Sequence, residues 1–294
     1  MTYIDLHYLG APHLIATAVI ETEAGPVLID PGPSTALGQL TAGLEKLGYG
    51  LADVEAILLT HIHLDHAGAT GTLVRHAPDA KVVVHRRGAL HMERPGRLIA
   101  SATQLYGDDM DRLWGAFEPV PAGTMHVVEG GETVEVGERT FEVAYTPGHA
   151  RHHVSYFDAS TSTAYVGDTV GMCVAGDAYV MPVTPPPDVD LAGWIESLGR
   201  LRAWSPEQLF RTHFGPSDSA AAQLDQFQDR LLEWEARVRS SYEPELDQEM
   251  QAARFKLWAL DDMRRHVPEA GWPPYEHFGL PEFSWAGLVR SLGT

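Results

Sequence analysis

Four potential metal ligands lie within six consecutive residues of this chain. The segment reads Thr60-His61-Ile62-His63-Leu64-Asp65-His66-Ala67-Gly68. Neutral imidazole nitrogens and carboxylate oxygens suit zinc, manganese and iron. A single His-x-His pair is often a surface accident, whereas three imidazoles and a carboxylate at this spacing favour a metal site. We therefore predict that this segment binds metal.

Strand-like runs precede this segment and three others that carry a histidine or an aspartate. The apolar run Val54–Leu59 predicts a short buried strand just before Thr60. The three other segments each place the potential ligand beside a glycine, which lets the backbone turn sharply and approach an ion. They are Thr146-Pro147-Gly148-His149, Val166-Gly167-Asp168-Thr169 and Arg211-Thr212-His213-Phe214-Gly215. The pattern indicates that ligands lie in loops leaving strand ends, where a sheet edge opens into a cleft.

Taken in order, these segments resemble those of the metallo-β-lactamase superfamily over roughly residues 1–218. The resemblance implies an α/β fold, a four-layer αβ/βα sandwich. It also implies seven metal ligands in two sites bridged by one carboxylate: His61, His63 and His149 at the first site, Asp65, His66 and His213 at the second, and Asp168 between them. Asp65 would also be catalytic, because it would orient a metal-bridging hydroxide for attack.

The bridging aspartate distinguishes branches of that superfamily. The β-lactamase branches typically lack it, whereas thioesterase, lactonase and phosphodiesterase branches have it. The motifs here are similar to those of hydroxyacylglutathione hydrolases and acyl-homoserine lactonases. The resemblance therefore implies a hydrolase of a carboxylic ester, thioester or lactone with two divalent ions, zinc first, with manganese or iron as alternatives. The second interpretation is a mononuclear iron sulfur dioxygenase on the same fold, which would leave the second site empty.

Composition narrows the classes of partner and compartment. The chain has 294 residues, with 21 lysines and arginines against 40 acidic residues and a net charge of −19. A nucleic-acid surface normally shows basic clustering, so we expect a small-molecule substrate and no nucleic acid. Cys173 is the only cysteine, so no disulfide is expected within the chain. No signal-peptide pattern and no apolar run near the ~20 residues of a membrane span are visible, so we expect a cytoplasmic protein without a membrane segment.

The order of elements repeats along the chain. Residues 14–30 predict a hairpin that ends in Asp30, followed by a helix over 36–47 and the strand before His61. Residues 153–167 predict a second hairpin that ends near Asp168, followed by a helix over 191–204 and a strand before His213. In this repeat Asp30 corresponds to Asp168 and His61 to His213. We interpret Asp30 as a hydrogen-bonding counterpart of a ligand.

Two segments predict an apolar pocket over the metals. One is the loop Thr169–Pro187, which begins at Asp168 and carries Met172 and Tyr179. The other is the insertion between the halves, which carries Tyr106, Met110, Trp114 and Phe117. The alternative is that both segments fill gaps in the core. Among the remaining histidines, His85 is interpreted mainly as packing, and His152 and His153 as buried residues behind the ligands.

The chain changes character after His213. Apolar residues recur at helical spacing over 224–238 and again over 246–263. The segment Gly271–Tyr275 with its two prolines predicts turns. We therefore predict a catalytic domain over residues 1–218 and a C-terminal helical appendage over 219–294. Its apolar stripes are expected to pack on each other and on the sandwich, with a homodimer contact or a pocket lid as alternatives.

Overall fold

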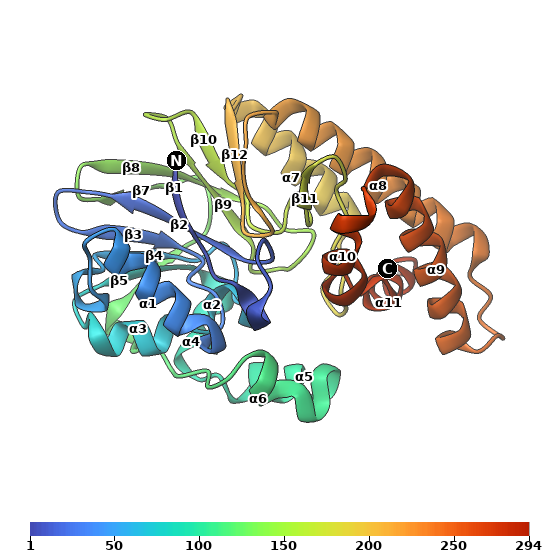
Figure 1. The fold of residues 1–294 in the computed structure, drawn as a ribbon, viewed down its shortest axis with the longest axis horizontal. Helices are drawn as coiled ribbons and strands as arrows, with labels where there is room; N and C mark the ends of the chain where they lie inside the picture. The colour runs from blue at the N-terminus through green and yellow to red at the C-terminus, as the bar shows by residue number, and fades with distance from the viewer. Residues whose placement is uncertain (294) are drawn as a thin grey trace.

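Two six-stranded sheets face each other in the computed structural model, which describes residues 1–293 (Figure 1). The first sheet follows chain order: β1 Thr2–Asp5, β2 Ala16–Glu21, β3 Pro26–Ile29, β4 Ala56–Leu58, β5 Lys81–His85 and β6 Met125–Val128. The second sheet has the order β13 Gly215–Ser217, β12 Gln208–Arg211, β10 Thr163–Tyr165, β9 Val154–Asp158, β8 Arg139–Tyr145 and β7 Thr133–Val136. We call each sheet with its helices a half of the molecule.

The strand pairing of the two halves repeats over four strands. In the first half, β2 pairs antiparallel with β1 and β3, and β3 pairs parallel with β4. In the second half, β9 pairs antiparallel with β8 and β10, and β10 pairs parallel with β12. The halves then differ, because β5 and β6 continue the first sheet in parallel while β13 turns back antiparallel.

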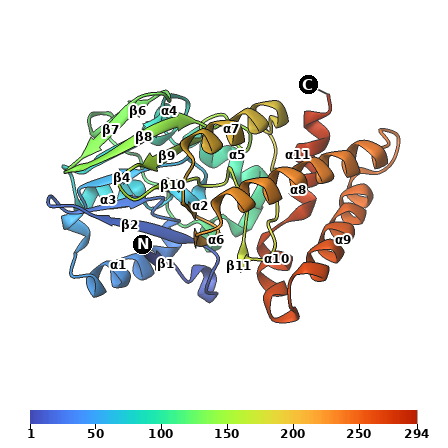
Figure 2. The ribbon, with the colours of Figure 1, turned by 90° about the horizontal axis from the view of Figure 1, so that it is seen from above.

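Helices cover the outer face of each sheet (Figure 2). Alternate residues of β2 show the division: Ala16, Ala18 and Ile20 pack between the sheets, whereas Val19 packs toward the helices. The covering helices of the first half are α1 Leu37–Lys46, α3 Thr70–His76 and α4 Arg86–Glu93. Those of the second half are α7 Leu191–Trp204 and α8 Ala220–Ser241. The predicted α/β four-layer αβ/βα sandwich is therefore confirmed.

Two additions flank this sandwich. The insertion between the halves forms α5 Gly96–Tyr106 and α6 Met110–Leu113, seen below the first half in Figure 1. The C-terminal part adds α9 Gln248–His266, α10 Trp272–Phe278 and α11 Pro281–Ser291, which lie beside α8 at the right of Figure 1. Within residues 1–293, no helix combines the length and the apolar character that a membrane crossing requires.

The turn predicted at Gly271–Tyr275 is wrong, because α10 begins at Trp272. Pro273 and Pro274 are the second and third residues of this helix, within the first turn, where a missing N–H costs no hydrogen bond. The division at residue 218 stays a prediction. Helix α8 begins at Ala220, close to that boundary, yet Leu224 and Phe227 of this helix share a core with the second sheet. Residue 294 of the predicted appendage lies outside the described residues.

Candidate metal centre

The ligand-rich segment leaves β4 and turns directly into the short helix α2 Leu64–Ala67. His63 is the residue before this helix and has an extended backbone, and Asp65 and His66 lie in the helix itself. His61 and His66 are buried, whereas His63 and Asp65 are partly exposed. The end of β4 and the start of α2 therefore hold all four donors of residues 61–66 close together.

The second half supplies its three donors from separate loops. His149 follows β8, Asp168 follows β10 and His213 follows β12. Gly167 precedes Asp168 with φ +47°, and a Cβ there would lie 2.4 Å from Thr60 Oγ1. Only glycine allows this loop to pack so closely against the ligand segment of the first half.

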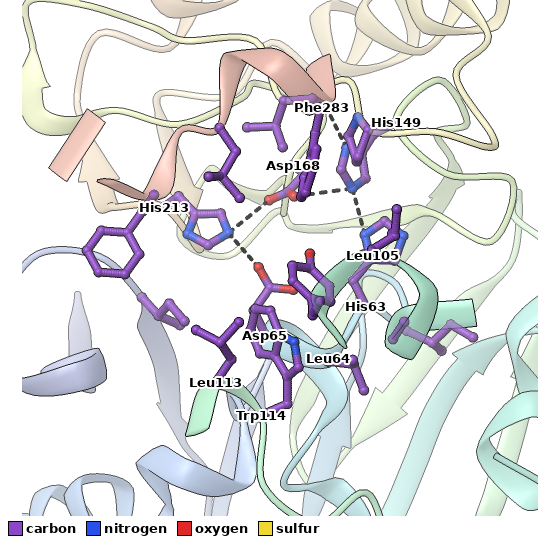
Figure 3. Close-up of a pocket in the computed structure, with 18 of the residues that line it drawn as sticks. His63, Leu64, Asp65, Leu105, Leu113, Trp114, His149, Asp168, His213 and Phe283 are labelled. Atoms are coloured by element: carbon purple, nitrogen blue, oxygen red, sulfur yellow. Dashed lines mark hydrogen bonds and ion pairs between the residues drawn. The ribbon is translucent and has the colours of Figure 1, made fainter. Parts of the chain in front are cut away.

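Three imidazoles form a first trio, His61, His63 and His149. The Nδ1 atom of His63 lies 3.0 Å from Nε2 of His61 and 2.8 Å from Nε2 of His149. Figure 3 shows His63 and His149 pointing toward each other across the pocket. Neutral imidazoles arranged in this way direct lone pairs to one point, as a metal requires.

Asp65, His66 and His213 form a second trio. The Oδ2 atom of Asp65 lies 3.3 Å from Nε2 of His213 and 3.7 Å from Nε2 of His66. The ligand atoms of each trio lie within 4.8 Å of one another. The structure thus brings together all the residues that the resemblance assigned to the two sites.

Asp168 lies between the trios (Figure 3). Its Oδ2 atom is 3.3 Å from Nε2 of His149 and 3.9 Å from Nε2 of His61. Its Oδ1 atom is 3.3 Å from Nε2 of His66 and 3.5 Å from Nε2 of His213. One carboxylate oxygen therefore faces each trio.

Two buried atoms of this centre lack hydrogen-bond partners. They are Oδ1 of Asp168 and Nε2 of His66, which form an ion pair at 3.3 Å without the geometry of a hydrogen bond. An ion between them would satisfy both atoms, so the donor set fits a metal of the kind that binds imidazole and carboxylate.

The outward-facing nitrogens of the histidines are held by the protein. His66 Nδ1 lies 2.8 Å from Asp30 Oδ2, His149 Nδ1 lies 2.8 Å from the Val183 carbonyl, and His213 Nδ1 lies 2.8 Å from the Leu14 carbonyl. Such bonds fix the tautomer and leave Nε2 free to ligate. The rings are therefore oriented before any metal binds.

Asp30 has a different task from the ligands. Its carboxylate accepts hydrogen bonds from the Thr60 amide, the Thr60 hydroxyl and the Thr212 hydroxyl, and it meets the His66 ring. It is fully buried and belongs to none of the ligand clusters found within residues 1–293. The predicted hydrogen-bonding role is confirmed, and the structure shows that it ties β4, α2 and β12 together.

Burial and charge set the protonation of the two trios. Burial holds the pKa of His61 well below its usual value and lowers the pKa of His63 to about 3, so both stay neutral. Burial alone would also lower the pKa of His66, but Asp168, Asp65 and Asp30 raise it well above the usual value. His66 is therefore cationic without a metal, and metal binding must displace its proton.

The carboxylates respond to the same imidazoles. Burial would raise the pKa of Asp168, but His66 and His213 hold it well below its usual range. The pKa of Asp65 falls to about 2, because His66 and His213 outweigh the effect of burial. Both carboxylates are anions at neutral pH, as ligands must be.

Neighbouring histidines support the centre rather than join the trios. His153 is buried, and its Nε2 accepts from the Asp168 amide at 3.2 Å, which steadies the bridging residue. His152 was expected behind the ligands; it stacks on His61 at 6.0 Å, but it is only partly buried and also lines the pocket. His85 stacks on Tyr145 and does not line the pocket, in agreement with a packing role.

A pocket of about 930 Å³ opens above the trios. The insertion contributes Tyr106 and Trp114 to it, and the loop after Asp168 contributes Met172. Helices α10 and α11 also line it, through Phe278 and Phe283, which agrees with the pocket-lid alternative for the appendage, although the apolar spacing predicted neither of these two helices.

The prediction that Tyr179 lines this pocket is wrong. Tyr179 is fully buried, its hydroxyl donates to Asp262, and the Arg230 guanidinium lies 4.4 Å above its ring. The C-terminal helices thus take Tyr179 into the core. Met110 and Phe117 of the insertion also pack against the core rather than line the pocket.

The family follows from a comparison with known proteins. The family model of the metallo-beta-lactamase superfamily matches residues 11–213, the part of the chain that carries all seven donors. The chain belongs to this superfamily. Its members bind divalent metals, which agrees with the two trios around Asp168.

Individual relatives agree at lower identity. A metallo-beta-lactamase fold-containing protein of Sulfurisphaera tokodaii is 30% identical over 69% of this chain and 74% of its own length. A hydroxyacylglutathione hydrolase of Synechococcus is 31% identical, but the match spans only 43% of this chain and 39% of that enzyme. The crystal structure of an archaeal superfamily protein from Sulfolobus tokodaii superposes over 99% of this chain and 98% of its own, with TM-score 0.68 and 24% identity. That likeness includes the C-terminal helices and shows the fold.

Proposed function

We propose that this chain is a dinuclear metal-dependent hydrolase of a carboxylic ester, thioester or lactone. Asp168 carries the proposal, because its two oxygens face one trio each. A carboxylate shared by two donor sets would hold a pair of divalent ions. The partial likeness to hydroxyacylglutathione hydrolases supports the same class of acyl substrate.

The charges of the donors suit acyl transfer. Two divalent ions would be met by two carboxylates, Asp65 and Asp168, and five neutral imidazoles. The centre would keep a net positive charge, which stabilises an anionic transition state. When bound, the ions would supply a Lewis acid for the carbonyl and a water whose pKa falls toward ~7.

Asp65 is the proposed catalytic residue. It lines the pocket, is partly exposed to it, and is ionised at neutral pH. Its carboxylate can therefore accept a hydrogen bond from the attacking water while it holds the second trio together. His152, which also lines the pocket and stacks on His61, would border a substrate on the side of the first trio.

Metal content and turnover test the proposal together. We expect elemental analysis to give two transition-metal ions per chain after loading with zinc, manganese or ferrous iron, and hydrolysis in a panel of esters, thioesters and lactones. Zinc is the first candidate. A stoichiometry that stays at one ion in excess metal would overturn the dinuclear proposal. One tightly held iron with oxygen consumption would favour the sulfur dioxygenase instead.

Asp65→Asn tests the catalytic assignment. We expect this nearly isosteric change to lower hydrolysis by about 10²–10⁴-fold, the usual effect of losing a group that orients or accepts a proton. Asp79→Asn, at an exposed position away from the pocket, is the matched control and should retain activity. Full activity in Asp65→Asn would remove this residue from the mechanism.

A further inference from the structure

The size of the pocket exceeds what a small acyl group needs. Its volume of about 930 Å³ is near the upper end of the ~300–1,000 Å³ typical of small-molecule sites. His63, Asp65 and His213 lie at the end where the proposed chemistry takes place. An acetyl or lactoyl group held there would leave most of the pocket unfilled.

Apolar side chains from three regions surround the remaining space. The insertion, the N-terminal loop between β1 and β2 (residues 6–15) and the C-terminal helices each contribute. They supply Leu98, Leu105 and Leu113 from α5 and α6, Leu9 and Leu14 from the N-terminal loop, and Phe278, Leu280 and Phe283 from the C-terminal part. The ring of Tyr106 meets that of Phe283 edge to face at 6.2 Å, so the insertion and α11 meet beside the pocket.

Two of these side chains are exposed to the pocket rather than packed in the core. Leu9 is 40% exposed and Leu105 is 38% exposed, although both line the pocket. Apolar area left in water gains free energy when a ligand covers it. Among the charged pocket residues, Asp109 and Arg112 pair with each other and are exposed, Arg97 is exposed, and Asp188 pairs with Arg151.

Backbone conformation marks two of the same leucines. Leu9 has φ +52° and Leu280 has φ +41°, a region where glycine is the usual residue. Seven non-glycine residues within 1–293 have positive φ, and these two are the only aliphatic ones among them. Both line the pocket. A disfavoured backbone that presents an apolar side chain to a cavity points to a binding role.

We propose that the pocket binds a long apolar acyl chain, with the ester, thioester or lactone carbonyl at the trios. The inference rests on the proposed function for the reacting group, and on the pocket alone for the chain. Leu9, Leu105, Leu280 and Phe283 would cover the chain along its length.

Binding of a probe that cannot be hydrolysed tests the chain site without turnover. Straight-chain 2-alkanones from 2-hexanone to 2-decanone are titrated into the zinc-loaded protein by calorimetry. We expect the affinity to rise about fourfold per added methylene, the usual gain for a buried methylene. Phe283→Ala and Leu105→Ala should each reduce this increment. Leu257→Ala removes a leucine that is 70% exposed on α9 outside the pocket, and it should change nothing. An affinity that does not depend on chain length would overturn the inference.

Hydrolysis of acetyl, hexanoyl and decanoyl thioesters then separates the two proposals. A kcat/KM that rises with chain length supports both. Hydrolysis that ignores chain length keeps the hydrolase but overturns the assignment of the site to the acyl group. Length-dependent binding of the alkanones without hydrolysis of any thioester overturns the proposed function and leaves the chain site standing.

Discussion

Asp30 and Asp168 occupy corresponding places in the two halves of the molecule, yet their surroundings differ. Each follows the strand that pairs parallel with the next, β3 or β10, and each is buried. Asp30 accepts hydrogen bonds from Thr60 and Thr212 and meets the His66 ring. Asp168 instead faces imidazole nitrogens of both trios, and its Oδ1 has no hydrogen-bond partner.

This difference shows how one architecture serves two tasks. A carboxylate whose lone pairs are all used by the protein stabilises the loops around it. A carboxylate in the same place that faces imidazole nitrogens is available to a metal, because its partners are themselves potential ligands. The two halves therefore repeat in strand order but not in chemistry.

Asp168→Asn should have the largest effect, and it falls on function. The amide cannot serve both trios as an anion, so we expect fewer than two ions per chain and hydrolysis lower by about 10³-fold, as for loss of a preorganised electrostatic group. Elemental analysis and turnover of the best substrate measure this. Two retained ions with normal turnover would show that Asp168 is no bridge.

Asp30→Asn should act on stability instead. Its amide nitrogen would face donors that now bond to a carboxylate, and His66 would lose a partner. We expect the metal-free protein to lose about 3 kcal/mol of unfolding free energy, the lower end for breaking a buried charged pair. Urea unfolding measures it. A smaller loss than in metal-free Asp168→Asn would contradict the division of roles.

Thr212→Val removes one donor to Asp30 from the second half without changing side-chain size. We expect a loss of about 1–2 kcal/mol in unfolding free energy, since the bond is to a charged, buried acceptor. Thr17→Val is the matched control, because the Thr17 hydroxyl donates to the Asp30 backbone carbonyl rather than to its carboxylate. Equal losses in the two variants would mean that the charge of Asp30 adds nothing.

His85 should give the smallest effect, through pH. It ends β5 in the first half and stacks on Tyr145 of the second at 4.6 Å. Burial, with Arg87 nearby, lowers its pKa to about 4. The unfolded chain binds the proton near pH 6.5, so the unfolded state gains protons first and stability falls as pH drops from about 6.5 to 4. His85→Gln should reduce this slope by at most one proton per chain in urea unfolding at several pH values, because buried His61 and His63 also contribute to it. An unchanged slope would contradict the assignment.

Local patterns account for much of what could be predicted. The helix over 191–204 was expected and is α7, because its apolar spacing is set by its own residues. The run Val54–Leu59 was expected as a strand, and β4 takes only Ala56–Leu58 of it, since strand ends depend on the neighbour that pairs with them. Pro273 and Pro274 misled the prediction at the C-terminus, because a proline pair can begin a helix as well as break one.

The pocket could not be predicted to the same extent. Tyr106 and Tyr179 look alike in sequence, as aromatic residues in segments near the ligands. Tyr106 faces the pocket, whereas Tyr179 is taken into the core by Asp262 and Arg230, more than 50 residues further along the chain. A side chain's surroundings depend on such distant partners, which no local pattern records.

By itself, the sequence determined the donors and the fold family. Residues 60–68 hold four donors that a strand end and a helix turn keep together, because neighbours in the chain are neighbours in space. Only the tertiary structure decided how His149, Asp168 and His213 join them and that α10 and α11 complete the pocket. It also decided that the protein fills the hydrogen bonds of Asp30 but not those of Asp168. These features depend on contacts between segments far apart in the chain, and such contacts exist only once the two sheets have packed.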